Sequence, residues 1–299
     1  MTSRSIFVAL VGKPNVGKSS LMNRYLGEKI AIVTYKPQTT RARITGILTR
    51  DGTQFVFIDT PGVHDPRTKL GERMVSASIK ALSDVDLVLM LFEPKGELDD
   101  AEKRLVDKIK SSNVTAIAAV NKADTAKDEE ARAKAEQIED LGVFEQVRII
   151  SATKGDGTQE LLDTIESYAP EGPHFFDDDA ITDMPEKDIA AEIVREKLLL
   201  NMRDEIPHGA NVEVESFKER NGGQIIDIDV VIYCEKSSHK GMIIGKQGSM
   251  LKKIGTRARH DMETFLGTKV NLKCFVKVKE DWRDSNSLLN EFGFKNEDK

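Results

Sequence analysis

The chain has 299 residues, with 44 Lys and Arg against 50 Asp and Glu and a formal net charge of −6. At about 150 residues per domain, this length predicts two domains, each large enough to bury a core. The mild acidity excludes a histone-like protein that binds polyanions with its whole surface. A single basic patch stays compatible with it, because charges more than about 8 Å apart are largely screened.

The residues that build extracellular scaffolds, metal centres and membrane spans are sparse. Two cysteines, Cys234 and Cys274, exclude a disulfide scaffold and a four-thiolate zinc site, and the five histidines have no metal-ligand spacing. The first apolar run, residues 6–11, is shorter than the apolar region of a signal peptide. No segment approaches the ~20 apolar residues that span a bilayer. We therefore expect a soluble intracellular protein, and we interpret both cysteines as small core hydrophobes.

The first half of the chain alternates predicted strands with predicted helices. The strands are expected at residues 6–11, 44–49, 54–58, 86–92, 115–120 and 147–150. The helices are expected at residues 76–82, 99–110 and 129–141, where apolar residues recur at helical spacing. Asp51-Gly52 predicts a hairpin between the second and third strands. This order is typical of an α/β domain whose sheet is mostly parallel.

A phosphate-loop pattern lies between the first strand and a helix-like run. It reads Gly12-Lys13-Pro14-Asn15-Val16-Gly17-Lys18-Ser19, followed by Ser20. The glycines let successive N–H groups point at phosphate oxygens, and the helix adds the positive end of its dipole. Lys18 can neutralise β- and γ-phosphate charge, and Ser19 can bind Mg²⁺. A glycine-rich turn that only joins strand to helix is the alternative interpretation.

A second pattern selects the base. Asn121-Lys122-Ala123-Asp124 ends a predicted buried strand, where loops reach a bound nucleotide. The Asp124 carboxylate can accept hydrogen bonds from N1–H and the 2-amino group of guanine, whereas adenine would leave it unpaired. Ser151-Ala152-Thr153, after the last strand of this half, fits a supporting loop beside the base. We therefore predict a guanine nucleotide site.

Two further segments can sense the γ-phosphate. Asp59-Thr60-Pro61-Gly62 ends the third strand, where Asp59 can hold Mg²⁺ through water and the Gly62 amide can contact the phosphate. Thr39-Thr40 can close over the metal, so we predict Ser19, Thr40 and Asp59 as the metal site. Val63 follows Gly62 and cannot orient water. His64 is the next candidate, although a solvated surface histidine is the more common outcome.

These elements, in this order, resemble the translation-factor-like GTPases. With the run Gln38 to Arg41 and Asp-Thr-Pro-Gly, the sequence is most similar to the Era family. The resemblance implies Mg²⁺-dependent GTP hydrolysis with catalytic roles for Lys18, Asn15, Thr40 and Gly62. It also implies that Asn15 helps to hold a K⁺ ion that supplies the charge of an arginine finger. Hydrolysis should then be slow and faster in K⁺ than in Na⁺.

The composition changes after residue 170. Residues 171–192 carry eight acidic residues and one lysine, punctuated by Pro and Gly. The first part of this stretch predicts an inter-domain linker, and the part from Asp188 predicts the start of a helix; a solvated loop within one large domain is the alternative. Beyond it we predict a helix at 189–206, strands at 211–219, 224–235 and 269–279, two short helices around residues 245–248, and a short amphipathic tail helix at 286–294. Trp282 follows the last strand, where it can stack on a base or, more simply, cover the sheet edge.

The second half carries a basic GxxG segment, Gly245-Lys246-Gln247-Gly248, ahead of a helix with Lys252, Lys253, Arg257 and Arg259. Residues 235–279 hold eleven Lys and Arg against three acidic residues. Two closely spaced glycines let a nucleic-acid backbone approach, as in a KH domain. The order helix–strand–strand–helix–helix–strand resembles the type II KH arrangement. We predict RNA contacts at Gly245 to Gly248, Lys252, Lys253 and Arg257; a tight helix–helix turn with a solvated lysine face is the alternative.

Together these features predict a P-loop, Ras-like GTPase domain with a mostly parallel sheet, followed by a smaller α+β type II KH domain. The expected boundaries are 1–170, a linker at 171–187, the KH domain at 188–281 and a tail at 282–299. The resemblance implies a cytoplasmic monomer that binds the 3′ end of 16S ribosomal RNA and acts in 30S subunit assembly and maturation, with peripheral membrane association. The alternatives are an RNA-binding adaptor with a vestigial nucleotide site, a P-loop kinase and a membrane-signalling GTPase.

Overall fold

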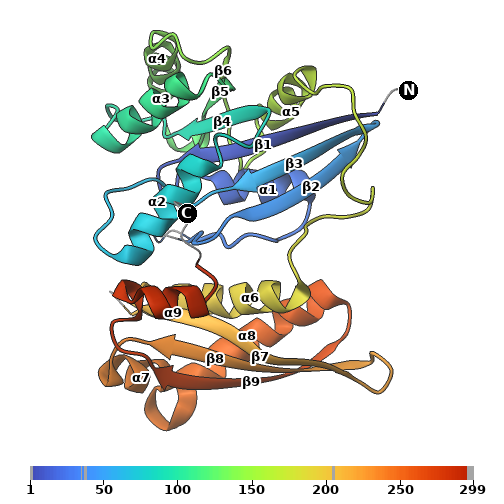
Figure 1. The fold of residues 1–299 in the computed structure, drawn as a ribbon, viewed down its shortest axis with the longest axis vertical. Helices are drawn as coiled ribbons and strands as arrows, with labels where there is room; N and C mark the ends of the chain where they lie inside the picture. Colours follow the sequence, from blue (N-terminus) through green and yellow to red (C-terminus); the bar gives the residue numbers. More distant parts are fainter. Residues whose placement is uncertain (1–2, 35, 37–38, 204–205, 295–299) are drawn as a thin grey trace. The chain divides into compact units, whose positions relative to one another are not determined.

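The structure is a computed structural model that describes residues 3–34, 36, 39–203 and 206–294. Gln38 of the predicted switch run lies outside these residues. The chain divides into two compact units, and the main boundary falls between Asp183 and Met184 (Figure 1). Over the described ranges, we find no helix that combines the length and the apolar character needed to cross a membrane.

A six-stranded sheet forms the centre of the first unit, in the order β2-β3-β1-β4-β5-β6. Its strands are β1 (Arg4–Gly12), β2 (Ile44–Arg50), β3 (Thr53–Asp59), β4 (Leu87–Phe92), β5 (Thr115–Val120) and β6 (Val147–Ile149). β2 and β3 are antiparallel around Asp51-Gly52, where both residues have positive φ, and all other neighbours are parallel. The predicted mostly parallel α/β fold is confirmed. Parallel strands end at one edge of the sheet, which brings the predicted motifs together.

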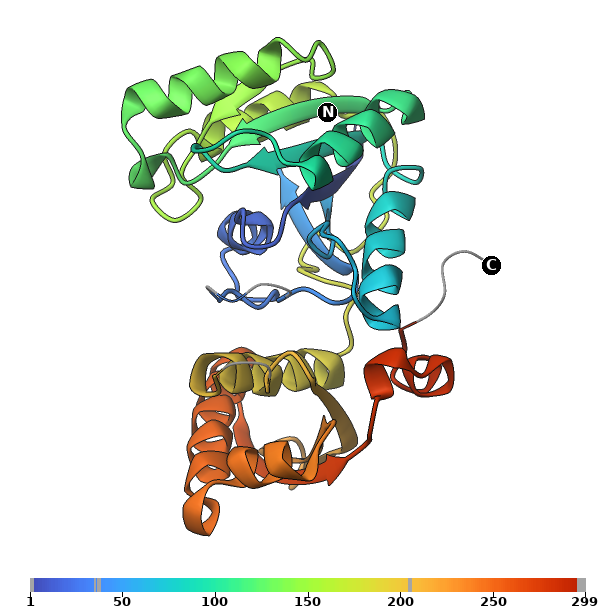
Figure 2. The same cartoon turned by 90° about the vertical axis from the view of Figure 1, so that its left-hand side faces the viewer.

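The helical elements described in this unit are α1 (Lys18–Leu26), α2 (Lys69–Lys80), α3 (Asp100–Ser112), η1 (Ala123–Thr125), α4 (Asp128–Glu139) and α5 (Thr158–Ser167), of which α5 follows the last strand. α3 and α4 pack on one face of the sheet (Figure 2). The core on this face includes Val11, Met90 and Leu105. On the other face Tyr25 of α1 stacks on Phe57, with ring centroids 5.3 Å apart. α2 begins seven residues before the predicted helix, and α5 was not predicted.

Most of the predicted acidic linker packs against the first unit. Gln54 of β3 is fully buried, and its side-chain amide both accepts from the Phe176 N–H (3.0 Å) and donates to the Phe176 carbonyl (2.9 Å). The Ile47 N–H of β2 donates to the Ile181 carbonyl at 2.9 Å. Hydrogen bonds therefore hold residues 171–183 against β2 and β3, and the second unit begins after these residues.

The second unit has the order α6-β7-β8-α7-α8-β9. Its elements are α6 (Glu186–Asn201), β7 (Ala210–Arg220), β8 (Ile225–Cys234), α7 (Ser237–Ile244), η2 (Lys246–Gly248), α8 (Ser249–Leu266) and β9 (Lys269–Val278). The sheet runs β7-β8-β9, with β7 antiparallel and β9 parallel to β8. One face buries Cys234 against Val194 of α6 and Ile254 of α8, whereas Cys274 is half-buried. The predicted element order is correct, but α8 is a long helix rather than a short one.

The single tryptophan belongs to the core of the second unit. Trp282 begins η3 (Trp282–Asp284), which leads into α9 (Asn286–Glu291). Its side chain is fully buried, Nε1 donates to the Gly209 carbonyl at 2.9 Å, and its ring meets Phe292 edge-on. A buried ring cannot stack on a base, so of the two interpretations the structural one holds.

Candidate functional site

The phosphate-loop pattern forms a backbone cradle between β1 and α1. Gly12 and Gly17 have φ of 141° and 103°, which favours glycine. A Cβ on Gly12 would lie 2.5 Å from the Leu91 carbonyl oxygen, and one on Gly17 would lie 2.1 Å from Asn121 Nδ2. Gly17 caps α1 without a side-chain hydrogen bond, so the first helical N–H groups face the cradle. The loop can therefore bind an anion at a helix N-terminus.

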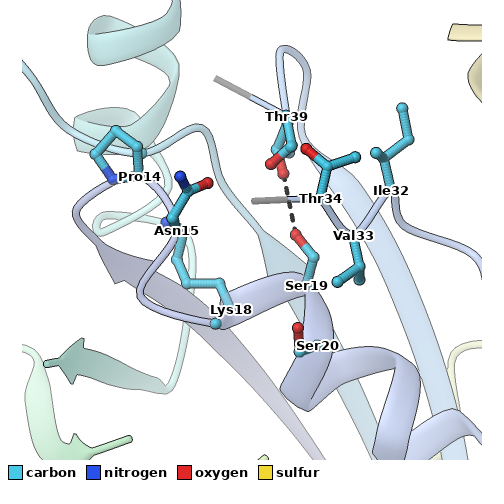
Figure 3. A pocket seen from close by; sticks show the side chains of 12 residues that line it. Pro14, Asn15, Lys18, Ser19, Ser20, Ile32, Val33, Thr34 and Thr39 are labelled. Carbon is cyan, nitrogen blue, oxygen red and sulfur yellow. Dashed lines mark hydrogen bonds between the residues drawn. The ribbon is translucent and has the colours of Figure 1, made fainter. Parts of the chain in front are cut away.

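Lys18 directs a buried ammonium group into this loop (Figure 3). Its Nζ donates to the carbonyl oxygens of Gly12 (3.2 Å) and Lys13 (2.8 Å). Burial lowers the pKa of the Lys18 ammonium to about 8, although the nearby Asp59 carboxylate acts in the opposite direction. A phosphate oxyanion would satisfy this ammonium better than two carbonyls do. Lys13 itself extends away from the loop, and its Nζ pairs with Asp99 at 2.9 Å.

The three predicted metal ligands meet in one cluster. Ser19 Oγ and Thr40 Oγ1 both donate to Asp59 Oδ2, at 2.6 and 3.1 Å. The two hydroxyl oxygens lie 3.1 Å from each other, and Figure 3 draws this contact as the dashed line from Ser19. The other carboxylate oxygen, Asp59 Oδ1, is buried and accepts no hydrogen bond from the described residues. Burial raises the pKa of the Asp59 carboxyl group, against the effect of Lys18. Hydroxyl and carboxylate oxygens around an unsatisfied buried oxygen are a donor set that fits Mg²⁺.

The segment after β3 lies directly against the phosphate loop. The Thr60 hydroxyl donates to the Leu10 carbonyl at 2.8 Å, and the Val63 N–H donates to the Gly12 carbonyl at 3.1 Å. A Cβ on Gly62 would lie 2.4 Å from the Pro14 nitrogen, so no larger residue fits this approach. Val63 is buried, as its apolar side chain requires. The backbone after Pro61 is thus held at the entrance to the cradle.

His64, the candidate for orienting water, has its side chain turned back on its own loop. The Nδ1 atom of its ring lies 2.9 Å from the Gly62 carbonyl oxygen. This contact occupies one of the two ring nitrogens with a backbone group of the same loop. The predicted catalytic roles of His64, Asn15, Lys18, Thr40 and Gly62 stay predictions.

The predicted base-binding segments lie side by side. Asn121 is buried; its Nδ2 donates to the Val16 carbonyl at 2.8 Å, and its Oδ1 accepts from the Ala152 N–H at 2.9 Å. The Ser151 hydroxyl donates to Asp124 Oδ1 at 2.6 Å. Asp124 is exposed, so its carboxylate stays accessible to a ligand beside the loop. Asn121 therefore joins the phosphate loop to the base-binding loop.

Several residues at this site carried no sequence motif. A pocket lies beside the phosphate loop, and part of its lining comes from the chain that leads out of α1: Ile32, Val33, Thr34 and Thr39 (Figure 3). Arg24 of α1 donates to the carbonyl oxygens of residues 152–154, at 3.2–3.4 Å. Its partners lie about 130 positions away in the sequence. No local pattern could therefore have identified Arg24 as a support of the base-binding loop.

The basic GxxG segment forms a sharp turn between α7 and α8. Gly245, Gln247 and Gly248 have φ of 72°, 52° and 78°, and a Cβ on Gly245 would lie 2.7 Å from Met250 Cβ. Beside this turn, α8 and β9 enclose a groove of about 370 Å³ whose α8 side includes Lys252.

The basic residues of α8 separate into two groups. Lys252 and Arg259 line the groove, whereas Lys253 and Arg257 do not. Arg257 Nη1 instead donates to Asn201 Oδ1 of α6 at 3.2 Å. The predicted contacts at Lys246, Gln247, Lys253 and Arg257 involve exposed side chains. They stay predictions, and Arg259 joins the candidates.

The fold and the two sites define a P-loop GTPase domain joined to a KH domain. A family model of 50S ribosome-binding GTPases matches residues 7–122, and a KH-domain model matches residues 205–283. The chain is 48% identical to GTPase Era of Ruminiclostridium cellulolyticum, over 99% of each chain, and 46% identical to GTPase Era of Clostridioides difficile, over 97% of this chain and 98% of that one. The chain therefore belongs to the Era family of GTPases.

Two solved structures of Era are similar along the whole chain. One is Era in complex with MgGDPNP and nucleotides 1506–1542 of 16S ribosomal RNA, at 36% identity and a TM-score of 0.92 over 98% of this chain and 99% of that one. The other is a variant of Aquifex aeolicus Era bound to GDP·AlF₄⁻, at 36% identity and a TM-score of 0.93 over 97% and 99%. The predicted family and fold class are thereby confirmed.

Proposed function

We propose that this chain is a GTP-binding and GTP-hydrolysing switch that binds the 3′ end of 16S ribosomal RNA through its KH domain. We further propose that it acts in assembly and maturation of the 30S subunit, because 16S RNA belongs to that particle. The observation that carries the proposal is that one chain contains both the set of residues for a guanine nucleotide, from Lys18 to Asp124, and a basic groove beside a GxxG turn. The similar Era structure that holds both MgGDPNP and this RNA supports the same assignment.

Different residues of the first unit bind the phosphates of GTP and the metal ion. The amides of residues 12–19 bind phosphate oxygens, and Lys18 neutralises the charge that develops between the β- and γ-phosphates. Ser19, Thr40 and Asp59 would hold Mg²⁺, which supplies charge neutralisation at the phosphates when bound. Thr40 is held at this cluster by its contacts with Asp59 and Ser19, so a ligand that replaced those contacts would act on the segment around Thr40 and could couple that segment to the nucleotide state.

Base selection follows from the Asp124 carboxylate. The Ser151 hydroxyl fixes one of its oxygens at 2.6 Å, which orients the carboxylate toward a ligand. Guanine offers two N–H donors to it, and adenine offers none in those positions. We therefore propose guanine nucleotides as the ligands and expect weak binding of ATP.

We also propose that K⁺ supports hydrolysis. Asn15 lies in the phosphate loop with φ of 64° and lines the nucleotide pocket, where its amide oxygen suits a monovalent cation (Figure 3). Hydrolysis should then be faster in KCl than in NaCl, and Asn15→Ala should remove the difference. Equal rates for the wild-type protein in the two salts would refute this part of the proposal.

The proposed cellular setting is the cytoplasm, with the protein acting as a monomer. Peripheral association with the inner face of the membrane follows from the family resemblance alone. A decisive experiment on function is a protein–RNA crosslinking map made with a GTP analogue, with GDP and without nucleotide. We expect crosslinks at residues 245–259 that are strongest with the GTP analogue. Crosslinks confined to the first unit, or indifferent to nucleotide, would refute coupling between nucleotide and RNA.

A further inference from the structure

Gly255 is a glycine that the protein's own packing does not require. It lies within α8, where glycine costs about 1 kcal/mol relative to alanine. Its φ is not positive, and a Cβ built on it would meet only Cys274 Sγ, at the ordinary contact distance of 3.7 Å. An alanine would therefore fit the described chain and stabilise the helix. The contacts among the described residues therefore give no reason for glycine at this position.

The missing side chain opens onto the groove beside the GxxG turn. Leu251 and Gly255 of α8 and Leu272 and Cys274 of β9 line its apolar part. Burial raises the pKa of the Cys274 thiol to about 11, so this group is neutral at physiological pH and behaves as a small hydrophobe. The groove thus offers an apolar surface next to the segment that would clamp a nucleic-acid backbone.

The rim of the same groove is basic. Lys252 and Arg259 line it, and Gly248 connects it to the GxxG turn. The surrounding residues 235–279 carry eleven Lys and Arg against three acidic residues in a chain of net charge −6. Phosphates on the rim and an unstacked base on the apolar surface are two kinds of contact that single-stranded RNA makes with its binding proteins.

We propose that Gly255 lets this groove accept one unstacked base, because its lack of a Cβ leaves the depth for the base to contact Leu272 and Cys274. The inference rests on the proposed RNA binding and adds to it a residue that sets the depth available to the base. A methyl group at position 255 occupies the space beside the Cys274 sulfur and lifts the base from the groove. The phosphate contacts at the rim are unaffected by this change.

The test compares two helical glycines of the full-length protein. Gly255→Ala is the test variant, and Gly241→Ala in α7 is the matched control, since Gly241 also lacks a positive φ and a Cβ there meets nothing within 4 Å. The probe is RNA of nucleotides 1506–1542 of 16S ribosomal RNA, titrated by fluorescence anisotropy in the presence of a GTP analogue. We expect a Tm equal to or above wild type for both variants. The Kd for RNA should rise about ten-fold for Gly255→Ala and stay within about two-fold for the control.

The salt dependence of binding separates base contacts from phosphate contacts. We expect Gly255→Ala to leave the slope of log K against log salt unchanged, whereas Lys252→Ala should reduce it by about 0.7, the value for one phosphate contact on a single strand. A wild-type Kd for Gly255→Ala, or a changed slope, would overturn the role of Gly255 while leaving RNA binding intact. If the wild-type protein fails to bind the RNA, the proposed function itself is wrong and the inference falls with it.

Discussion

Replacing Asn121 with alanine breaks the connection between the phosphate loop and the base-binding loop. The side chain makes two buried hydrogen bonds, to the Val16 carbonyl at 2.8 Å and from the Ala152 N–H at 2.9 Å. Each bond contributes about 1 kcal/mol net, and each buried group left unpaired costs about 1–3 kcal/mol. We therefore expect the free energy of unfolding to fall by about 2–4 kcal/mol, measured by urea denaturation without nucleotide.

The same substitution should also weaken GTP binding, because the two loops that we propose to contact the phosphates and the base of the nucleotide lose their common support. We expect the Kd for GTP, measured by calorimetry, to rise at least about ten-fold. Gln54→Ala is the matched control, since this buried amide also bridges backbone groups but lies at the outer strands. It should lose similar stability and keep its GTP affinity within about two-fold. Equal GTP affinities for the two variants would refute the reasoning.

Three other predictions test separate parts of the structure. Gly62→Ala places a methyl group 2.4 Å from the Pro14 nitrogen. We therefore expect steady-state GTP hydrolysis to fall at least about ten-fold while the affinity for GDP is retained, and normal turnover would contradict this packing. The pKa of Lys18 is lowered to about 8 without ligand, and bound phosphates should raise it again. The proton uptake by Lys18 on GTP binding should therefore be larger near pH 8.5 than near pH 6.5. Calorimetry in buffers of different ionisation enthalpy measures this uptake, and the same enthalpy in all buffers near pH 8.5 would contradict it. Trp282 is buried, so saturating RNA should leave its fluorescence emission nearly unchanged, and strong quenching would indicate base stacking.

The sheets could be predicted because buried strands leave a simple apolar pattern. The strand predicted at residues 115–120 has the bounds of β5, whose residues are almost all buried. The start of α2 was missed because Gly71 separates Leu70 from the rest of the helical pattern, although Leu70 and Met74 are both buried. Helix propensity was outweighed there by tertiary packing.

The acidic segment is a case in which composition could not predict packing. Its Pro, Gly and Asp content indicates a loop, and it forms no helix or strand up to residue 183. Its backbone groups nevertheless find partners along β2 and β3, with Gln54 and Ile47 among them. Hydrogen bonds between backbone groups far apart in sequence depend on register, which residue composition does not encode.

The positions of the nucleotide motifs could be predicted, whereas the energetic consequence of their contacts could not. The Thr40 hydroxyl donates to Asp59 and lies 3.1 Å from Ser19, so the segment that would close over the metal is already held by the groups that would bind it. A metal must replace these hydrogen bonds, each worth about 1 kcal/mol net, before its own contacts add stability. The free energy gained when the segment closes over the metal is therefore only the difference between the metal contacts and the hydrogen bonds that they replace. A difference of a few kcal/mol is the range in which one phosphate can move a two-state equilibrium, which is what a nucleotide-dependent switch requires.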